Sequence, residues 1–256
     1  MGEETTKQSF SNKESLEARK EIFSLMEDFK WNDSEKERSL GLFIRGSLLA
    51  RIVAIQELYL KIIDLPGSIY DIGTWRGQTA VLCENFRAIY EPLNFKRKII
   101  CFDTFTGYPK FSEKDKPLKY QTEGSYEVGG EEYKDYLKKL ITLHEKSNAM
   151  GHIFNKHEIV VGNTKETIPK YLKENPHNLI SLAFLDLNSY ESTLQALENI
   201  YQRVVPSGVI AFWQLENKEI QAEGSVYNDF INGKKIHTCF NSKVYPGLCY
   251  IIKGVR

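Results

Sequence analysis

Several features that would point to a particular class of protein are scarce or missing in this sequence. The 256 residues include 34 basic and 34 acidic side chains, and the net charge of +0 gives no field that would draw the chain to nucleic acid or an anionic membrane. No apolar run approaches the roughly 20 residues that span a bilayer. The first 20 residues are polar and lack the apolar core of a secretory signal. We therefore expect a cytoplasmic protein with no nucleic-acid partner and no membrane span.

Cysteine is also sparse, with four residues and no C-x-x-C pair. Cys101 and Cys249 lie in apolar, strand-like runs, which favours buried free thiols in a reducing compartment. The dinucleotide pattern G-x-G-x-x-G is missing after the first predicted strand, which argues against a nicotinamide dehydrogenase. Aromatic side chains are plentiful, with 3 Trp, 14 Tyr and 14 Phe. The chain can therefore bury a sizeable core.

Residues 1–66 are predicted to form an N-terminal helical extension. We expect one helix over 17–29, capped by Ser15, and a second over 35–64, capped at 32–34 and interrupted near Gly41 or Gly46. The second helix is apolar over much of its surface, so it is expected to pack on a core and on a second copy of the chain.

Residues 67–256 alternate between strand and helix patterns. This order predicts an α/β fold with a doubly wound, mostly parallel, seven-stranded sheet and an antiparallel C-terminal hairpin. Strands are expected at 69–72, 98–102, 158–161, 179–187, 209–213, 235–240 and 248–253, and helices at 78–90, 131–146, 164–174, 190–204 and 225–231. Residues 104–130 are irregular and too long for an ordinary connection, which is typical of a lid.

The ends of the first two predicted strands carry the clearest functional signal. Ligands of doubly wound sheets bind beyond the carboxyl ends of the strands. The first strand ends at Asp71 and continues into a G-x-x-x-G loop, Gly73 to Gly77, that contains a Trp and an Arg. Such a loop is too bulky for a pyrophosphate and suits a smaller zwitterion, such as the methionine part of S-adenosylmethionine. Asp103 ends the second strand, where a ribose hydroxyl pair would be held.

Twelve residues follow from this interpretation as the binding site for S-adenosylmethionine. They are Asp71, Gly73, Thr74, Arg76, Gly77, Gln78, Thr79, Asp103, Thr104, Gly162, Asn163 and Thr164. The first loop and helix N-terminus would meet the sulfonium, amino and carboxylate groups, Asp103 the ribose, and 162–164 the adenine. Two alternatives are open. Asp103 caps only the turn that follows it, or 162–163 form only a turn before a helix capped by Thr164.

Five segments together carry a family pattern. They are FIRGSLLARIVAIQELYLKIIDLPGSIYDIGTWRGQT, EPLNFKRKIICFDTFTGYP with Asp115 just beyond, VVGNTKETIP, LAFLDLNSYESTLQALENI and PSGVIAF. Their order and spacing resemble the macrocin O-methyltransferase-like group of class I methyltransferases, in the branch linked to sugar and surface-polysaccharide modification. The resemblance implies a Rossmann-like fold, S-adenosylmethionine as methyl donor and a nucleotide-linked or polysaccharide sugar as acceptor. It also implies a divalent cation (Mg or Mn) in many members and homodimers or higher oligomers through the N-terminal helices.

The chain departs from this family at the expected cation site. The family resemblance implies an acid after the fourth strand and two acids after the fifth. Here Asp186 is present, but Trp213 and Gln214 replace the acidic pair, and Glu216 lies two residues further on. Asp186, Gln214 and Glu216 would be a poor set for a hard cation that prefers several anionic oxygen ligands.

Without a cation, a side chain must take the proton of the acceptor hydroxyl. Asp186 and Glu216 are the catalytic candidates, and His152 and His157 are of the right type but are expected at the surface before the third strand. Contacts to the acceptor are assigned to Arg45, Tyr108 and Tyr190. The lysines of the insert that could bind the diphosphate of a sugar nucleotide are Lys110, Lys114, Lys116 and Lys119. Two other functions are open. One is methylation of an amine, amide or phosphoramidate without metal, and the other is a non-catalytic homologue that binds S-adenosylmethionine.

Overall fold

The computed structural model describes residues 12–28, 30–115, 121–148, 155–218, 220–234 and 237–254. The chain divides into two compact units, one that ends at Arg51 and one that begins at Ile52. Among the described residues, no single helix is long and apolar enough to cross a membrane. One bent pair, Asp33–Phe43 with Gly46–Leu60, meets the length and composition criteria only when its two parts are joined.

The first unit is helical. It contains α1 (Lys13–Asp28), α2 (Asp33–Ser39), a 3₁₀ turn (Leu40–Phe43) and the start of α3 (Gly46–Leu60). The predicted cap at Ser15 is wrong, because Asn12 Oδ1 accepts from the Ser15 backbone N–H at 2.8 Å and the helix starts earlier. The predicted cap before α2 is confirmed, since Asn32 and Glu35 form a reciprocal capping box.

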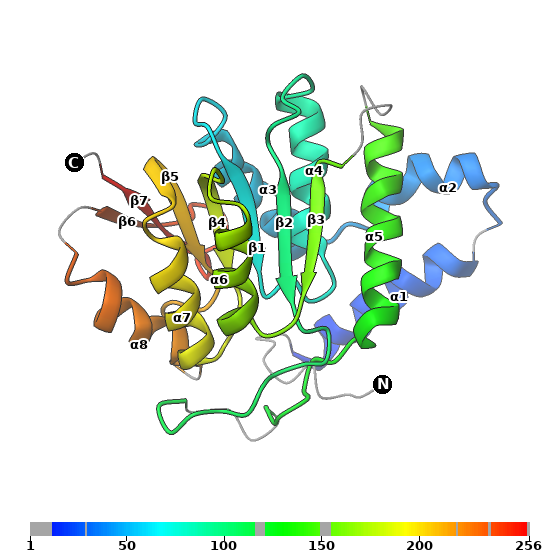
Figure 1. Cartoon of the computed structure of the whole chain (residues 1–256). Coiled ribbons are helices and arrows are strands. Elements are labelled where there is room, and N and C mark those ends of the chain that lie inside the picture. Colours follow the sequence, from blue (N-terminus) through cyan, green and yellow to red (C-terminus); the bar gives the residue numbers. More distant parts are fainter. Residues whose placement is uncertain are drawn as a thin grey trace. The chain divides into compact units, whose positions relative to one another are not determined.

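The second unit contains one seven-stranded sheet in the order β3-β2-β1-β4-β5-β7-β6 (Figure 1). The strands are β1 (Ser68–Ile72), β2 (Ile99–Asp103), β3 (His157–Val161), β4 (Ile180–Leu185), β5 (Val204–Phe212), β6 (His237–Asn241) and β7 (Cys249–Lys253). The first five are parallel, and β7 pairs antiparallel with both β5 and β6. The predicted sheet and closing hairpin are therefore confirmed. The order of strands reverses between β1 and β4, which is the switch point where ligands bind in such sheets.

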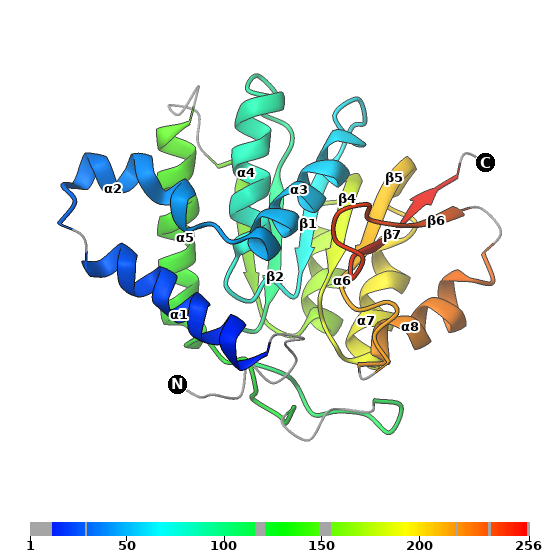
Figure 2. The ribbon, with the colours of Figure 1, turned by 180° about the vertical axis from the view of Figure 1, so that it is seen from behind.

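Helices cover both faces of this sheet, as Figures 1 and 2 show. One face packs on α6 (Thr164–Glu174), α7 (Tyr190–Ile200), α8 (Ala222–Val226) and the π-helical turn Tyr227–Ile231. The other packs on the second-unit part of α3, on α4 (Gln78–Tyr90) and on α5 (Gly130–Ser147). Because β1 and β4 are buried along their whole length, their sequences are almost continuously apolar.

Three boundaries differ from the prediction near the fifth strand. The helix predicted to end at Val204 ends at Ile200, because Val204 already pairs with Ile180 of β4 and β5 continues to Phe212. The segment Pro206-Ser207-Gly208 is an irregularity inside β5, with Ser207 at a φ of 66°, and is not the turn before it. The next helix begins at Ala222 instead of Ser225, which brings Glu223 into helical structure.

Candidate functional site

The loop after β1 passes directly over the end of β4. Asp186 donates its backbone N–H to Ile72 O at 3.0 Å, and Gly73 has a φ of 84°. A Cβ on Gly73 would lie 2.3 Å from the carbonyl oxygen of Asp186. Only glycine combines this conformation with so close an approach. The loop and the end of β4 are therefore built as one surface.

Asp103, at the end of β2, holds the same loop from the other side. Its Oδ2 accepts from the Trp75 backbone N–H and its Oδ1 from the Phe105 backbone N–H, both at 2.7 Å. The turn-capping alternative is thus present in the structure. A carboxylate offers about four lone-pair sites, so room for ribose hydroxyls remains. Burial raises the pKa of Asp103, while N–H groups of Trp75, Phe105 and Thr104 oppose the rise.

The end of β3 joins this surface through Gly162. Its N–H donates to Asp103 O at 2.9 Å, and its φ is 132°. Asn163 Oδ1 accepts from the Lys165 backbone N–H at 3.0 Å, so Asn163 caps α6 and the alternative cap at Thr164 is wrong. Three strand ends that carry the predicted donor residues therefore lie side by side.

The remaining donor candidates lie on or beside the first loop. Gly77, with a φ of 77°, precedes α4, and Thr74 Oγ1 donates to Asp71 O at 2.8 Å. The Arg76 guanidinium lies 4.5 Å from the Trp75 ring centroid. Gln78 is exposed at the start of α4, Thr79 is buried behind it, and Thr104 Oγ1 donates to Gly107 O.

The insert between β2 and α5 reaches the end of β4 through aromatic side chains. Figure 1 shows its described parts beyond the carboxyl ends of β2 and β3. Tyr108 OH accepts from Asn188 Nδ2 at 2.9 Å. The Tyr108 ring lies 5.2 Å from Tyr126, which lies 5.8 Å from Trp75, measured between centroids. The insert thus meets both the donor loop and the region after β4.

Asp115 fixes the insert to α7. Its Oδ1 accepts from the Tyr190 backbone N–H at 2.5 Å, and its Oδ2 accepts from the Ser112 N–H at 2.7 Å. The Tyr190 hydroxyl donates to Asp229 at 2.7 Å and accepts from Lys114 Nζ at 2.9 Å. Tyr190, predicted as an acceptor contact, is therefore 3% exposed and already committed to this network.

Sequence reasoning missed one acid at this edge. Glu223 is fully buried on α8, and its Oε2 accepts from the Gln214 backbone N–H at 2.8 Å. Burial first and the Asp186 charge second raise the pKa of Glu223 well above its usual range, against N–H bonds from Gln214 and Leu187. The available signal was an acid between Ala222 and Gly224 shortly after the fifth strand, but the helix was predicted to begin only at Ser225.

The residues at the ends of β4 and β5 do not fit a divalent cation. Trp213 packs its ring against Phe184 and Tyr245, at centroid distances of 6.3 and 5.7 Å. Gln214 Oε1 accepts from Asn217 Nδ2 at 2.7 Å, and Glu216 is exposed. Within the described ranges, no three His, Cys, Asp or Glu side chains are grouped to hold a metal.

The other predicted residues lie elsewhere. His157 begins β3, at the amino end of the strand. It was expected at the surface, but its side chain is only 6% exposed, with Nδ1 3.5 Å from Glu145. Arg45 belongs to the first unit, where it donates to Ser47. Lys116, Lys119 and His152 fall outside the described residues.

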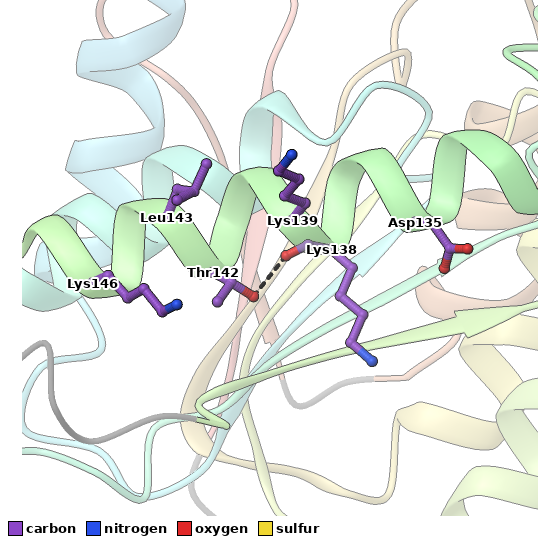
Figure 3. Close-up of a pocket in the computed structure, with 6 residues that line it drawn as sticks. All are labelled: Asp135, Lys138, Lys139, Thr142, Leu143 and Lys146. Carbon is purple, nitrogen blue, oxygen red and sulfur yellow. Dashed lines mark hydrogen bonds between the residues drawn. The ribbon is translucent and has the colours of Figure 1, made fainter.

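A hollow of about 370 Å³ lies on α5, lined by Asp135, Lys138, Lys139, Thr142, Leu143 and Lys146 (Figure 3). All of these residues belong to one helix and none follows a strand. The hollow is a feature of the helix surface, separate from the strand-end site.

The strand order, the glycine loop after β1 and the acid at the end of β2 together define the class I methyltransferase fold. Within that class, the chain belongs to the macrocin-O-methyltransferase (TylF) family, whose model matches residues 49–243.

Solved structures support this assignment. The chain is similar to CalS11, a calicheamicin methyltransferase, with 29% identity, a TM-score of 0.91 and coverage of 100% of this chain and 98% of that one. A second structure of CalS11, described as an apo TDP-rhamnose 3'-O-methyltransferase, gives 28% identity, a TM-score of 0.83 and coverage of 96% and 97%. The O-methyltransferase NovP, at 16% identity, TM-score 0.61 and 84% coverage of both chains, shares the fold.

A curated relative is the mycinamicin III 3''-O-methyltransferase of Micromonospora griseorubida. It is 24% identical over 147 residues, which is 56% of this chain and 53% of the relative. The matched region thus spans about half the length of this curated relative.

Proposed function

We propose that this protein is an S-adenosylmethionine-dependent O-methyltransferase whose acceptor is a sugar hydroxyl, nucleotide-linked or in a surface-polysaccharide precursor. One observation carries the proposal: the loop after β1, held by Asp103, meets Asp186 at the switch point of the sheet. The similarity to CalS11, a TDP-rhamnose 3'-O-methyltransferase, supports the choice of a sugar.

The donor site is proposed to consist of the three strand ends around Asp103. Gly73 lets the first loop lie against the Asp186 carbonyl and Gly162 lets its own loop lie against Thr167, and the N-terminus of α4 offers N–H groups to a carboxylate. When bound, S-adenosylmethionine supplies a methyl group that its sulfonium has already activated. The residues present fit such a molecule because they combine an acid for hydroxyls with a tight backbone cradle.

Asp186 is proposed as the base. The acceptor oxygen bonds to the methyl carbon while the carbon–sulfur bond breaks and its electrons remain on sulfur, and Asp186 takes the hydroxyl proton. Its place between the donor loop and Asn188 suits this role. Because the leaving group is already activated, orientation of the two reactants supplies much of the catalysis.

Residues 104–130 are proposed to cover the acceptor as a lid. Two residues of this insert bond to residues that follow β4: Tyr108 accepts from Asn188, and Lys114 donates to Tyr190. Lys110 and Lys114 are proposed to meet the charged part of a sugar nucleotide.

We also propose that the protein is a cytoplasmic homodimer or higher oligomer, assembled through the N-terminal helices. Leu40, Leu42 and Leu49 of the first unit are 55%, 73% and 50% exposed, and this apolar surface supports the proposal. Light scattering of the purified chain should give at least twice the 29.6 kDa of one chain. Substitution of these leucines by Ser should then return the mass of one chain.

The experiment has two arms. Calorimetry should show binding of S-adenosylmethionine, and mass spectrometry should show transfer of a methyl group to a nucleotide-linked deoxysugar such as TDP-rhamnose. Asp186→Asn should keep donor binding and lose roughly 100-fold or more in kcat, as expected for a lost general base. A chain that does not bind the donor would refute the whole proposal.

An amine or amide acceptor is a second candidate, favoured by the replacement of the acidic pair by Trp213 and Gln214. Turnover on amines together with no turnover on sugar nucleotides would select it. Methyl transfer to any acceptor would exclude a non-catalytic homologue.

A further inference from the structure

We propose that Tyr108 and Asn188 together recognise a second hydroxyl of the acceptor, next to the hydroxyl that is methylated. Tyr108 donates a hydrogen bond to this second hydroxyl, and Asn188 accepts one from it. The inference rests on the proposed function, because it takes a sugar as the acceptor and Asp186 as the base. It narrows the acceptor to a sugar with two neighbouring hydroxyl groups, a vicinal diol.

The insert fixes the position of Tyr108 through both its backbone and its ring. The Tyr108 N–H donates to Ser125 O, and the Tyr108 carbonyl accepts from the Gly124 N–H, both at 3.0 Å. The ring contacts Phe111 and Tyr126, at centroid distances of 5.4 and 5.2 Å. The phenol is therefore held in place by its own segment, and its hydroxyl is left to meet other parts of the site.

Asn188 belongs to the turn that follows β4, two residues after the proposed base Asp186. Its φ of 50° lies in the left-handed region, which asparagine tolerates better than most side chains do. Its Nδ2 donates to the Tyr108 hydroxyl at 2.9 Å. This amide therefore joins the insert to the segment that carries the base.

The bond between the two side chains leaves one donor and one acceptor unused. A phenol has a single hydrogen to donate, and the oxygen of Tyr108 already accepts from Asn188. Among the residues that the structure describes, none accepts the hydrogen of this hydroxyl. Within the same residues, Asn188 Oδ1 is buried and has no hydrogen-bond partner. Because buried polar groups are normally paired, the two side chains point to a ligand group that both accepts and donates.

A hydroxyl meets both requirements. It accepts from the Tyr108 O–H and donates to Asn188 Oδ1, whereas a carboxylate cannot donate and an ammonium cannot accept. The methylated hydroxyl gives its proton to Asp186, so a second hydroxyl of the same acceptor must bond to Asn188. Since Oδ1 is covered by protein atoms, the side chains above it move as the acceptor enters, as expected of a site beneath a lid.

The test measures kcat/KM on TDP-rhamnose and on the two analogues in which one hydroxyl next to the methylated position is replaced by hydrogen. The variants are Tyr108→Phe and Asn188→Gly, since glycine permits the left-handed backbone at position 188. Each variant should lower kcat/KM on TDP-rhamnose about 10- to 30-fold, as the loss of a hydrogen bond to substrate does. On one analogue, wild type should lose a similar factor and the variants less than about twofold more, because the recognised hydroxyl is already missing.

Tyr136→Phe, on the exposed side of α5, is the matched control and should equal wild type with every acceptor. Full activity of Tyr108→Phe on TDP-rhamnose, or an equal loss on the diol and on both analogues, would overturn the inference and leave the proposed function intact. If wild type binds TDP-rhamnose without methylating it, the proposed function fails alone. Calorimetry with the same variants and analogues then decides the inference. If wild type neither binds nor methylates TDP-rhamnose, the inference fails with the proposed function.

Discussion

Asp103 accepts hydrogen bonds from two loops and is proposed to accept more from a ribose. Replacement by Asn keeps one accepting oxygen and removes the charge. We expect Asp103→Asn to weaken donor affinity by about 1–3 kcal/mol, because paired polar groups lose a partner. Calorimetry with S-adenosylhomocysteine measures this change. Asp135→Asn, on the exposed side of α5, is the control, and equal affinity in both variants would remove Asp103 from the ribose.

Glu223 makes stability depend on pH. The groups that face it or share its field are Asp186, Tyr108 of the insert and Cys249 of β7. Because the folded pKa lies above the unfolded one, the unfolded chain ionises first as pH rises, and wild type loses stability from about pH 4.5 up to the folded pKa. Glu223→Gln does not ionise, so its melting temperature should gain on wild type over this range. A constant difference in thermal melts from pH 4.5 to 8 would be the contrary result.

At the scale of single residues, the sequence predicts those whose role depends only on the backbone next to them in the chain. Gly73 and Asp103 follow from the pattern of a strand end, since backbone geometry dictates them. Glu223 does not, because its burial beside Asp186 depends on how α8 packs against the sheet. The roles of Arg45 and Tyr190 toward an acceptor stay predictions.

Among the elements, one carboxyl of the insert holds the start of α7. Asp115 bonds to the first backbone N–H of α7 and to Ser112 within the insert. We expect Asp115→Ala to lower the free energy of unfolding by about 0.5–2 kcal/mol, as loss of a helix cap does. It should also speed cleavage of the insert by a protease. Glu113→Gln, exposed in the same segment, should change neither.

Two helices were predicted with the correct boundaries. Helices 78–90 and 164–174 begin and end as predicted, although the cap of the second is Asn163 and not Thr164. The start of β5 was not predicted correctly, because Pro206-Ser207-Gly208 has the composition of a turn and yet lies within a strand. This segment lies within a strand because the residues on both sides of it pair with β4, and a strand's pairing partner cannot be read from the neighbouring sequence.

In the second unit as a whole, a buried charge pair at the amino end of the sheet connects distant segments. Arg97 bonds to Glu91 through Nε and Nη2, to Gly67 O and Ser181 Oγ through Nη1, and to Ile62 O. Arg97→Met should lower the free energy of unfolding by about 3–5 kcal/mol, because it leaves Glu91 buried without a counter-charge.

The matched control is Lys98→Met. Its ion pair with Glu158 is 41% and 34% exposed, so the expected loss is at most about 1 kcal/mol. Urea titrations measure both. Similar losses in the two variants would show that burial does not strengthen the role of Arg97.

Trp213 ties the chemistry of the site to the packing of the core. Its ring packs between Phe184 of β4 and Tyr245 of the turn before β7. An acid introduced at this position would remove a large ring from a dense interior, at a cost of about 3–5 kcal/mol. Installing a cation site here would therefore require simultaneous repacking of two other segments. An engineer who wants a metal enzyme must begin with the hydrophobic face of the sheet.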